Sequence, residues 1–185
     1  FRITFDTEGG SSVAPQLVAE GHKAYPPVKV PERNGYAFIG WSAERGSSTL
    51  YDFSSSVRND MTLYAVWKAV KEVAFAYDLP ASLGKEAELS PCPQPEAVPE
   101  GSTISRPEAT LSYNGTRFGF LGWFKEGSTE PFDFSSGITE DITLHARWED
   151  HAIASDGGYI VYSEEGLRKW AEAAPSASCT LIADI

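Results

Sequence analysis

The sequence predicts a mainly β protein with short helices, an α+β fold in which one unit occurs twice in tandem. Aromatic-rich blocks in the first half of the chain return in the second half at a nearly constant spacing. The last block of each half alternates apolar and polar side chains, as expected for a strand with one buried face. Proline-rich stretches between the blocks keep any helix in the repeats short.

The duplicated blocks define the two repeats. Phe-Ile-Gly-Trp at 38–41 returns as Phe-Leu-Gly-Trp at 120–123, an offset of 82 because 120 − 38 = 82. Two further blocks, starting at Tyr51 and Asp60, return at an offset of 81, since 132 − 51 = 81 and 141 − 60 = 81. We therefore expect residues 1–68 and 69–150 to form two β-grasp-like repeats, with Lys68 to Glu72 as the link between them.

Each repeat contains recognisable strands and turns. In the second repeat the apolar positions of the final strand are Ile142, Leu144, Ala146 and Trp148. The offset assigns Met61, Leu63, Ala65 and Trp67 to the same face of the first repeat. The first strands are expected at Ile3–Asp6 and Val73–Asp78.

The Gly-Trp blocks and their flanks carry further local signals. Turns are expected at Asn34-Gly35 and Asn114-Gly115, because Asn and Gly tolerate a positive φ. Gly40 and Gly122 are expected to leave room for a large ring from across the sheet. A short helix is expected at 14–19 or 81–90.

Residues 151–185 differ from both repeats and predict the start of a further domain. Tyr159 to Tyr162 has the composition of a strand. Ser163 is a suitable N-cap, and apolar residues recur behind it at helical spacing. Pro175 ends this helix, and Cys179 to Ile185 alternates again as a strand. We read the chain as a piece of a longer protein.

The composition excludes several classes of function. The net charge is −11, and the excess of acids lies in residues 69–150 and 151–185, since residues 1–68 contain seven acids and seven bases. Without a basic stripe the chain is not expected to bind nucleic acid. No apolar run approaches the ~20 residues of a membrane span, so no membrane insertion is expected in this part of the protein.

No motif predicts catalysis or a cofactor. Cys92 and Cys179 form neither a metal-ligand pattern nor a disulfide framework. The histidines have no ligand spacing, and nucleophile elbows and phosphate loops are absent from the sequence. Asp52 and Asp133 recur between aromatic residues, but each repeat supplies only one, so they are expected to accept backbone N–H bonds in turns. Asp60 and Asp141 are read in the same way.

The recurring aromatic residues have two interpretations. As paired positions with apolar neighbours they are expected to form the core of each repeat. The expected structural core is Phe38, Trp41, Phe53, Leu63, Trp67, Phe120, Trp123, Phe134, Leu144 and Trp148. The alternative is recognition by exposed rings, for which the expected patch is Tyr25, Tyr64, Tyr113 and Phe124.

The ordered blocks resemble those of the Listeria–Bacteroides repeat, the B-repeat of internalin-like surface proteins. The resemblance covers about residues 3–68 and 73–149, through the Asn-Gly turn, Phe-x-Gly-Trp, aromatic-Asp-Phe and Asp-x-Thr-Leu-x-Ala-x-Trp. It implies a small β-grasp-like unit arranged in tandem on secreted or wall-attached bacterial proteins. The sequence departs from the pattern at the insert from Pro91 to Pro107 and at His145, which replaces the usual tyrosine. The tail resembles the start of a right-handed parallel β-helix.

The expected function is that of a non-catalytic tandem-repeat spacer or presentation module on the bacterial cell surface or in a secreted protein, with adhesion as an added role. The alternative is a carbohydrate- or protein-binding module appended to a surface enzyme. A host or cell-surface protein or a glycan is the expected kind of partner, no cofactor is expected, and the chain is expected to be monomeric.

Overall fold

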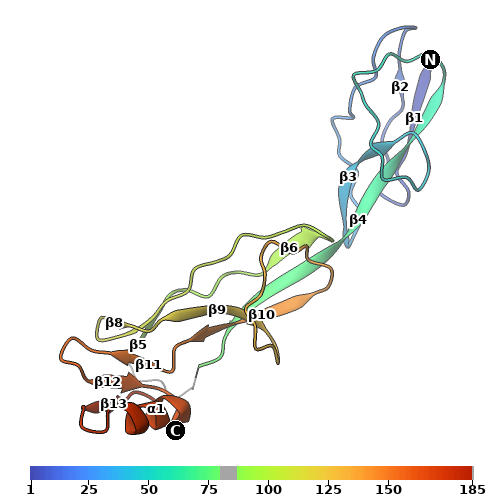
Figure 1. Ribbon diagram of the computed structural model, residues 1–185. Coiled ribbons are helices and arrows are strands. Elements are labelled where there is room, and N and C mark those ends of the chain that lie inside the picture. Colours follow the sequence, from blue (N-terminus) through green and yellow to red (C-terminus); the bar gives the residue numbers. More distant parts are fainter. Residues whose placement is uncertain (80–86, 185) are drawn as a thin grey trace. The chain divides into compact units, whose positions relative to one another are not determined.

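The computed structural model describes residues 1–79 and 87–184, and it is mainly β with one short helix among these residues, as predicted (Figure 1). In chain order the elements are β1 (Arg2–Asp6), β2 (Gln16–Leu17), β3 (Tyr36–Ser42), β4 (Met61–Tyr77), β5 (Ala87–Leu89), β6 (Glu96–Pro99), β7 (Leu111–Tyr113), β8 (Thr116–Arg117), β9 (Phe120–Lys125), β10 (Ile142–Trp148), β11 (His151–Ile153), β12 (Tyr159–Val161), α1 (Glu164–Ala173) and β13 (Cys179–Leu181).

The chain divides into two compact units, which are described separately below. The first unit comprises Phe1–Lys71 with Val98–Ser102, and the second comprises Glu72–Ala97 with Thr103–Ile185. These units divide the chain between Lys71 and Glu72, and the division into repeats at residues 68 and 69 stays a prediction. The tail, which we expected to begin a further domain, belongs to the second unit.

The first unit is built on a mixed sheet. β1 is parallel to the first part of β4, with Ile3 opposite Met61, and β2 is antiparallel to β1. β3 is antiparallel to β4 on its other side. The connection between the parallel strands β1 and β4 contains β2 and β3. The helix that we expected at 14–19 is absent there, because Gln16 and Leu17 pair with β1 instead.

The second unit repeats this arrangement with equivalent strands. The last part of β4 is parallel to β10, with Val73 opposite Ile142, and β9 is antiparallel to β10. β6 pairs with β4 as β2 pairs with β1. β5, β7 and β8 form a separate small sheet. Of the alternative helix at 81–90, residues 81–86 lie outside the described residues and 87–89 form β5.

The residues expected to link the repeats, Lys68 to Glu72, lie within a strand. β4 runs without a break from Met61 to Tyr77, so it is the last strand of the first repeat and the first strand of the second. The sequence between these residues contains neither glycine nor proline. Nothing in it therefore interrupts the extended backbone.

The turns and glycines follow the sequence in part. Asn114 and Gly115 both have positive φ, 46° and 78°, and join β7 to β8 in a two-residue hairpin. Gly40 lies at a bulge of β3, and a Cβ there would lie 2.9 Å from the side chain of Leu50. The space at Gly40 is therefore filled by the side chain of Leu50 and not by the aromatic ring that we expected.

The tail forms a strand-helix-strand unit that packs within the second unit. β12 and β13 are parallel and are joined by α1, while β11 is antiparallel to β12. Ser163 caps the helix as predicted, because its hydroxyl accepts a hydrogen bond from the Gly166 N–H. A helical crossover between parallel strands is the arrangement of a βαβ unit, not of a β-helix coil. The Tyr162 hydroxyl donates to the carbonyl of Trp148 at 3.2 Å, which ties the tail to β10.

Candidate binding surface

The core of the first unit is a cluster of aromatic and aliphatic side chains around Trp41. Trp41 is 4% exposed, and its ring centroid lies 4.8 Å from that of Phe5 and 5.3 Å from that of Phe38. Leu63 is fully buried beside it. Phe38, Phe53 and Trp67 are partly buried and pack against this cluster. The indole N–H of Trp67 donates to the Thr7 carbonyl at 2.9 Å.

The second unit repeats the same ring contacts. Trp123 is completely buried, and its ring centroid lies 4.9 Å from Phe75 and 5.9 Å from Phe120. Its indole N–H donates to the Pro107 carbonyl at 2.8 Å. Trp148 is 3% exposed and Leu144 is fully buried.

The edge-to-face pair Tyr51–Phe53 of the first repeat returns as Phe132–Phe134. The ring centroids are 5.0 Å apart in both pairs. Phe134 is partly buried, as Phe53 is. The aromatic contacts themselves are therefore duplicated, along with the residue types.

The recurring carboxylates accept backbone N–H bonds, as predicted. Asp52 and Asp133 do so in turns, whereas Asp60 and Asp141, for which a turn was also expected, accept from residues distant in sequence. Asp52 accepts hydrogen bonds from the backbone N–H and the hydroxyl of Ser54, and Asp133 accepts the same pair from Ser135. The hydroxyl bond is the larger cause that lowers the pKa of each carboxyl below its ordinary value.

The second pair of carboxylates holds the beginnings of equivalent strands. Asp60 accepts from the Arg2 N–H at 2.8 Å, and Asp141 accepts from the Glu72 N–H at 2.8 Å. Arg2 begins β1, and Glu72 precedes the part of β4 that pairs with β10. All four recurring aspartates thus accept backbone N–H bonds.

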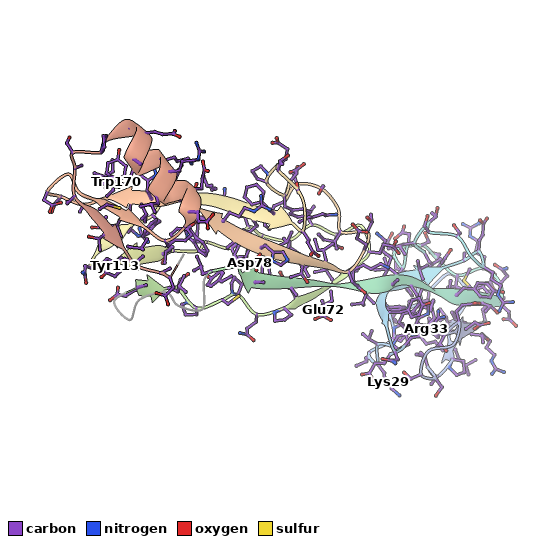
Figure 2. All side chains as sticks on the ribbon, turned by 90° about the horizontal axis from the view of Figure 1, so that it is seen from below. Lys29, Arg33, Glu72, Asp78, Tyr113 and Trp170 are labelled. Carbon is purple, nitrogen blue, oxygen red and sulfur yellow. The ribbon has the colours of Figure 1, made fainter. Side chains whose placement is uncertain are left out.

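The predicted exposed aromatic residues have different environments, and the prediction is wrong for Phe124. Phe124 is 5% exposed because the guanidinium of Arg147 lies 4.4 Å above its ring, held there by a hydrogen bond to the Ser128 carbonyl. Tyr64 is partly buried, with Arg45 over its ring. Tyr113, labelled in Figure 2, is also partly buried on β7.

Tyr25 is the most exposed of the four, at 73%, and it lines a hollow beside β2. This hollow, called the β2 hollow below, has a volume of about 490 Å³. Its other lining residues are Gln16, Leu17, Val18, Ala19, His22, Lys23, Pro26 and Val28. Leu17 and Val28 are 88% and 104% exposed. The sequence analysis did not single out these two aliphatic residues.

The segment that carries Tyr25 is fixed to β2 by the side chain of Gln16. The Gln16 amide nitrogen donates to the Tyr25 carbonyl at 2.6 Å, and the Tyr25 N–H donates to the Gln16 amide oxygen at 3.1 Å. The side chain thus pairs with the backbone as a neighbouring strand does. Ala24, next to Tyr25, is 1% exposed and anchors the segment in the core.

Three titratable side chains of the second unit, those of His145, Cys92 and Cys179, are set apart by their surroundings. His145 Nδ1 lies 2.6 Å from a carboxylate oxygen of Asp78, although the alignment of the two groups is not that of a hydrogen bond. Burial raises the pKa of the thiols of Cys92 and Cys179, which favours their protonated forms. Among the described residues there is no group of three or more His, Cys, Asp or Glu that is arranged to hold a metal ion.

Comparison with known proteins identifies the repeats. The sequence matches the Listeria-Bacteroides repeat domain over residues 1–66 and 84–147. The first matched segment contains β1, β2, β3 and the beginning of β4, and the second contains β5 to β9 and β10 as far as Arg147. This chain belongs to the Listeria-Bacteroides repeat domain family.

Two relatives come from Evansella cellulosilytica. One, named "Putative membrane protein", is 34% identical over 151 residues, which are 80% of this chain and 21% of the relative. The other, named "Putative Gly-rich membrane protein", is 28% identical over 167 residues, which are 85% of this chain and 18% of the relative. The chain thus spans about a fifth of the length of each. No solved structure matches the chain. In the described residues no helix has the length and apolar character to span a membrane.

Proposed function

We propose that this chain is a non-catalytic repeat module of a bacterial surface protein, where it acts as a spacer that presents other parts of the protein. The observation that carries the proposal is the role of the duplicated residues. The recurring tryptophans pack in the two cores, and the recurring aspartates accept backbone hydrogen bonds. A sequence that duplicates packing and turn residues in this way duplicates a building unit.

A catalytic role has little support from the same residues. The oxygens of Asp52 and Asp133 are engaged by the neighbouring serines. The pKa of each carboxyl is lowered, whereas a general acid at neutral pH needs a raised pKa.

A location at the cell surface is supported by the names of the two relatives, each of which is described as a membrane protein. The relatives are also much longer than the matched region, as expected if the repeats are one part of a larger protein. On this basis we assign the chain to the bacterial cell surface or to a secreted protein.

The test uses the full-length parent protein on its native cell. In one strain residues 1–150 are deleted, and in a second strain they are replaced by an unrelated β domain of equal length. For a spacer, the deletion reduces antibody access to an epitope placed on the far side of the repeats, and the replacement restores it. Equal access in all strains would contradict the spacer role.

A second candidate is a protein- or carbohydrate-binding module, with a host or cell-surface protein or a glycan as partner. The observation in its favour is the β2 hollow with the exposed ring of Tyr25. The same strains separate the two candidates. If adhesion is lost in the replacement strain while epitope access is normal, the repeats themselves bind the partner.

A further inference from the structure

We infer that the β2 hollow of the first repeat is a binding site for a peptide segment that carries apolar side chains next to a carboxylate. This inference deepens the second candidate function and is independent of the spacer role. Three observations support it. The apolar lining residues occur in one repeat and not in the other, hydrogen bonds fix the wall of the hollow, and the lining contains a lysine but no acidic residue.

The apolar lining of the hollow is found in the first repeat alone. Gly21 and Gly101 are equivalent, since both have positive φ within corresponding Glu-Gly pairs, and the offset here is 80 because 101 − 21 = 80. At this offset Leu17, Tyr25 and Val28 become Ala97, Ser105 and Glu108, all of which are exposed.

The buried neighbours are preserved between the repeats. Val18 is 8% exposed and its equivalent Val98 is 9% exposed. The fold therefore requires the buried valine but not the large apolar residues around it. Large exposed apolar side chains that the architecture does not need are a mark of an interaction surface.

The wall of the hollow is held in place before any ligand binds. Besides the two bonds between Gln16 and Tyr25, the Gly21 N–H donates to the Val57 carbonyl at 3.1 Å, and the Val57 N–H donates to the His22 carbonyl at 2.8 Å. Val57 is 2% exposed and belongs to the core. A fixed wall lowers the entropy that a ligand must overcome on binding.

The charge of the lining favours an acidic partner. Lys23 lines the hollow and no acidic residue does. Lys29 is the residue after the lining residue Val28 in the sequence. Lys29 is exposed and is labelled in Figure 2. In the described part of the first unit the close ion pairs are those of Arg45 with Asp6 and Glu8. Besides the hydrogen bonds from Ser54, the ammonium group of Lys23 is near enough to Asp52 to contribute to the lowered pKa of that carboxyl, but it makes no close ion pair with it. A carboxylate beside an apolar side chain complements this combination.

A peptide fits the lining better than a glycan does. Sugar hydroxyls need several hydrogen-bond partners, but both polar atoms of the Gln16 side chain are engaged by Tyr25. The side chains of His22, Lys23 and Tyr25 are the other polar groups of the lining. Leu17 and Val28 offer only aliphatic surface to a ligand. Apolar peptide side chains bury that surface, whereas a polar glycan leaves hydroxyls without partners.

The probe is a blocked peptide of sequence LFLDD, with LFLNN and SGSDD as matched controls for the carboxylates and for the apolar side chains. Binding to the ¹⁵N-labelled chain is followed by NMR. We expect saturable amide shifts in residues 16–28 with a Kd of about 1 mM or below. Residues 96–108 of the second repeat serve as the internal control and are expected not to respond.

Variants of exposed residues identify the site without disturbing the core. Leu17→Ser and Val28→Ser are each expected to weaken LFLDD binding by about tenfold. The control Leu121→Ser, at an exposed position of β9, is expected to leave it unchanged. Lys23→Gln is expected to weaken LFLDD by about threefold and to leave LFLNN unaffected.

Three results would overturn the inference: no saturable shift with LFLDD, equal shifts in both repeats, or binding that is insensitive to Leu17→Ser and Val28→Ser. Light scattering of the free chain tests another occupant. If the chain is a dimer that Leu17→Ser converts to a monomer, the hollow is covered by a second copy and the peptide assignment is wrong.

Discussion

Replacement of Trp123 by alanine should unfold much of the second unit. Trp123 is fully buried, and its ring contacts Phe75, Tyr77 and Phe120. Its indole N–H satisfies the carbonyl of Pro107. The substitution removes a large interior side chain and leaves an acceptor without its partner.

The expected loss combines two contributions. Truncation of a buried aromatic side chain costs about 3–5 kcal/mol. The Pro107 carbonyl, which is part-buried, also loses its donor, so the free energy of unfolding should fall by at least about 3–5 kcal/mol. Domains have total stabilities of about 5–15 kcal/mol, so this loss removes a large part of the stability of the unit.

The measurement is urea unfolding followed through NMR amide signals of β9 and β10, with signals of β1 as the reference for the first unit. The midpoint for β9 and β10 should fall by about 2 M or more. The control Leu121→Ala, at the 46% exposed neighbour on β9, should change the stability by less than about 1 kcal/mol. An unchanged midpoint for Trp123→Ala would show that the ring is not a core residue.

Three further predictions concern the second unit. Hydrogen bonds from Ser135 lower the pKa of Asp133. The ionised carboxylate therefore stabilises the folded state above the ordinary pKa of 3.8, and this stabilisation is lost as the pH falls through the folded-state pKa. Asp133→Asn should weaken the acid dependence of the melting temperature. Gly166→Ala places a Cβ against the Asp150 backbone and should cost about 1–3 kcal/mol in thermal unfolding. Burial raises the pKa of Tyr162 from 10.0 to about 12, so stability should fall as the pH rises between these values, and an ultraviolet titration should show one late tyrosine.

Each of these predictions has a control and a contradicting result. For the acid dependence the control is Glu126→Gln, and equal pH profiles of Asp133→Asn and the wild type count against the prediction. For the helix the control is Ala171→Ser at an exposed position of α1, and an unaltered melting temperature of Gly166→Ala contradicts the close packing. For the tyrosine, a Tyr162→Phe variant that retains the late ionisation shows that another residue is responsible.

The sequence allowed prediction of features that depend on local chemistry or on the duplication. The hairpin at Asn114-Gly115 follows from the tolerance of these residues for positive φ. The roles of Asp52 and Asp133 follow from the short reach of the carboxylate to the next backbone groups. The duplication also predicted equivalent strands, because the matched blocks at 60–67 and 141–148 contain β4 and β10 residues that pair in the same way with their parallel neighbours.

Features that depend on contacts between residues distant in the sequence could not be predicted from the sequence. Phe124 is buried because Arg147, distant in sequence, lies over it. Gly40 faces Leu50 for the same kind of reason. The sequence from Met61 to Tyr77 lacks glycine and proline, which is consistent with one continuous strand β4. The presence of two repeats nevertheless suggested a linker between them. The β2 hollow also left a signal, since Leu17 and Val28 are apolar in the first copy and their equivalents are not.

Acrylamide quenching of tryptophan fluorescence in a Trp170→Phe variant tests the central claim most directly, because the remaining indoles are the four duplicated ones. Three of them, Trp41, Trp123 and Trp148, are 4%, 0% and 3% exposed. The account predicts a quenching constant several-fold below that of free N-acetyltryptophanamide, rising to the free value in urea. A native-state constant near the free value would contradict the claim that the duplicated tryptophans form the cores of the repeats.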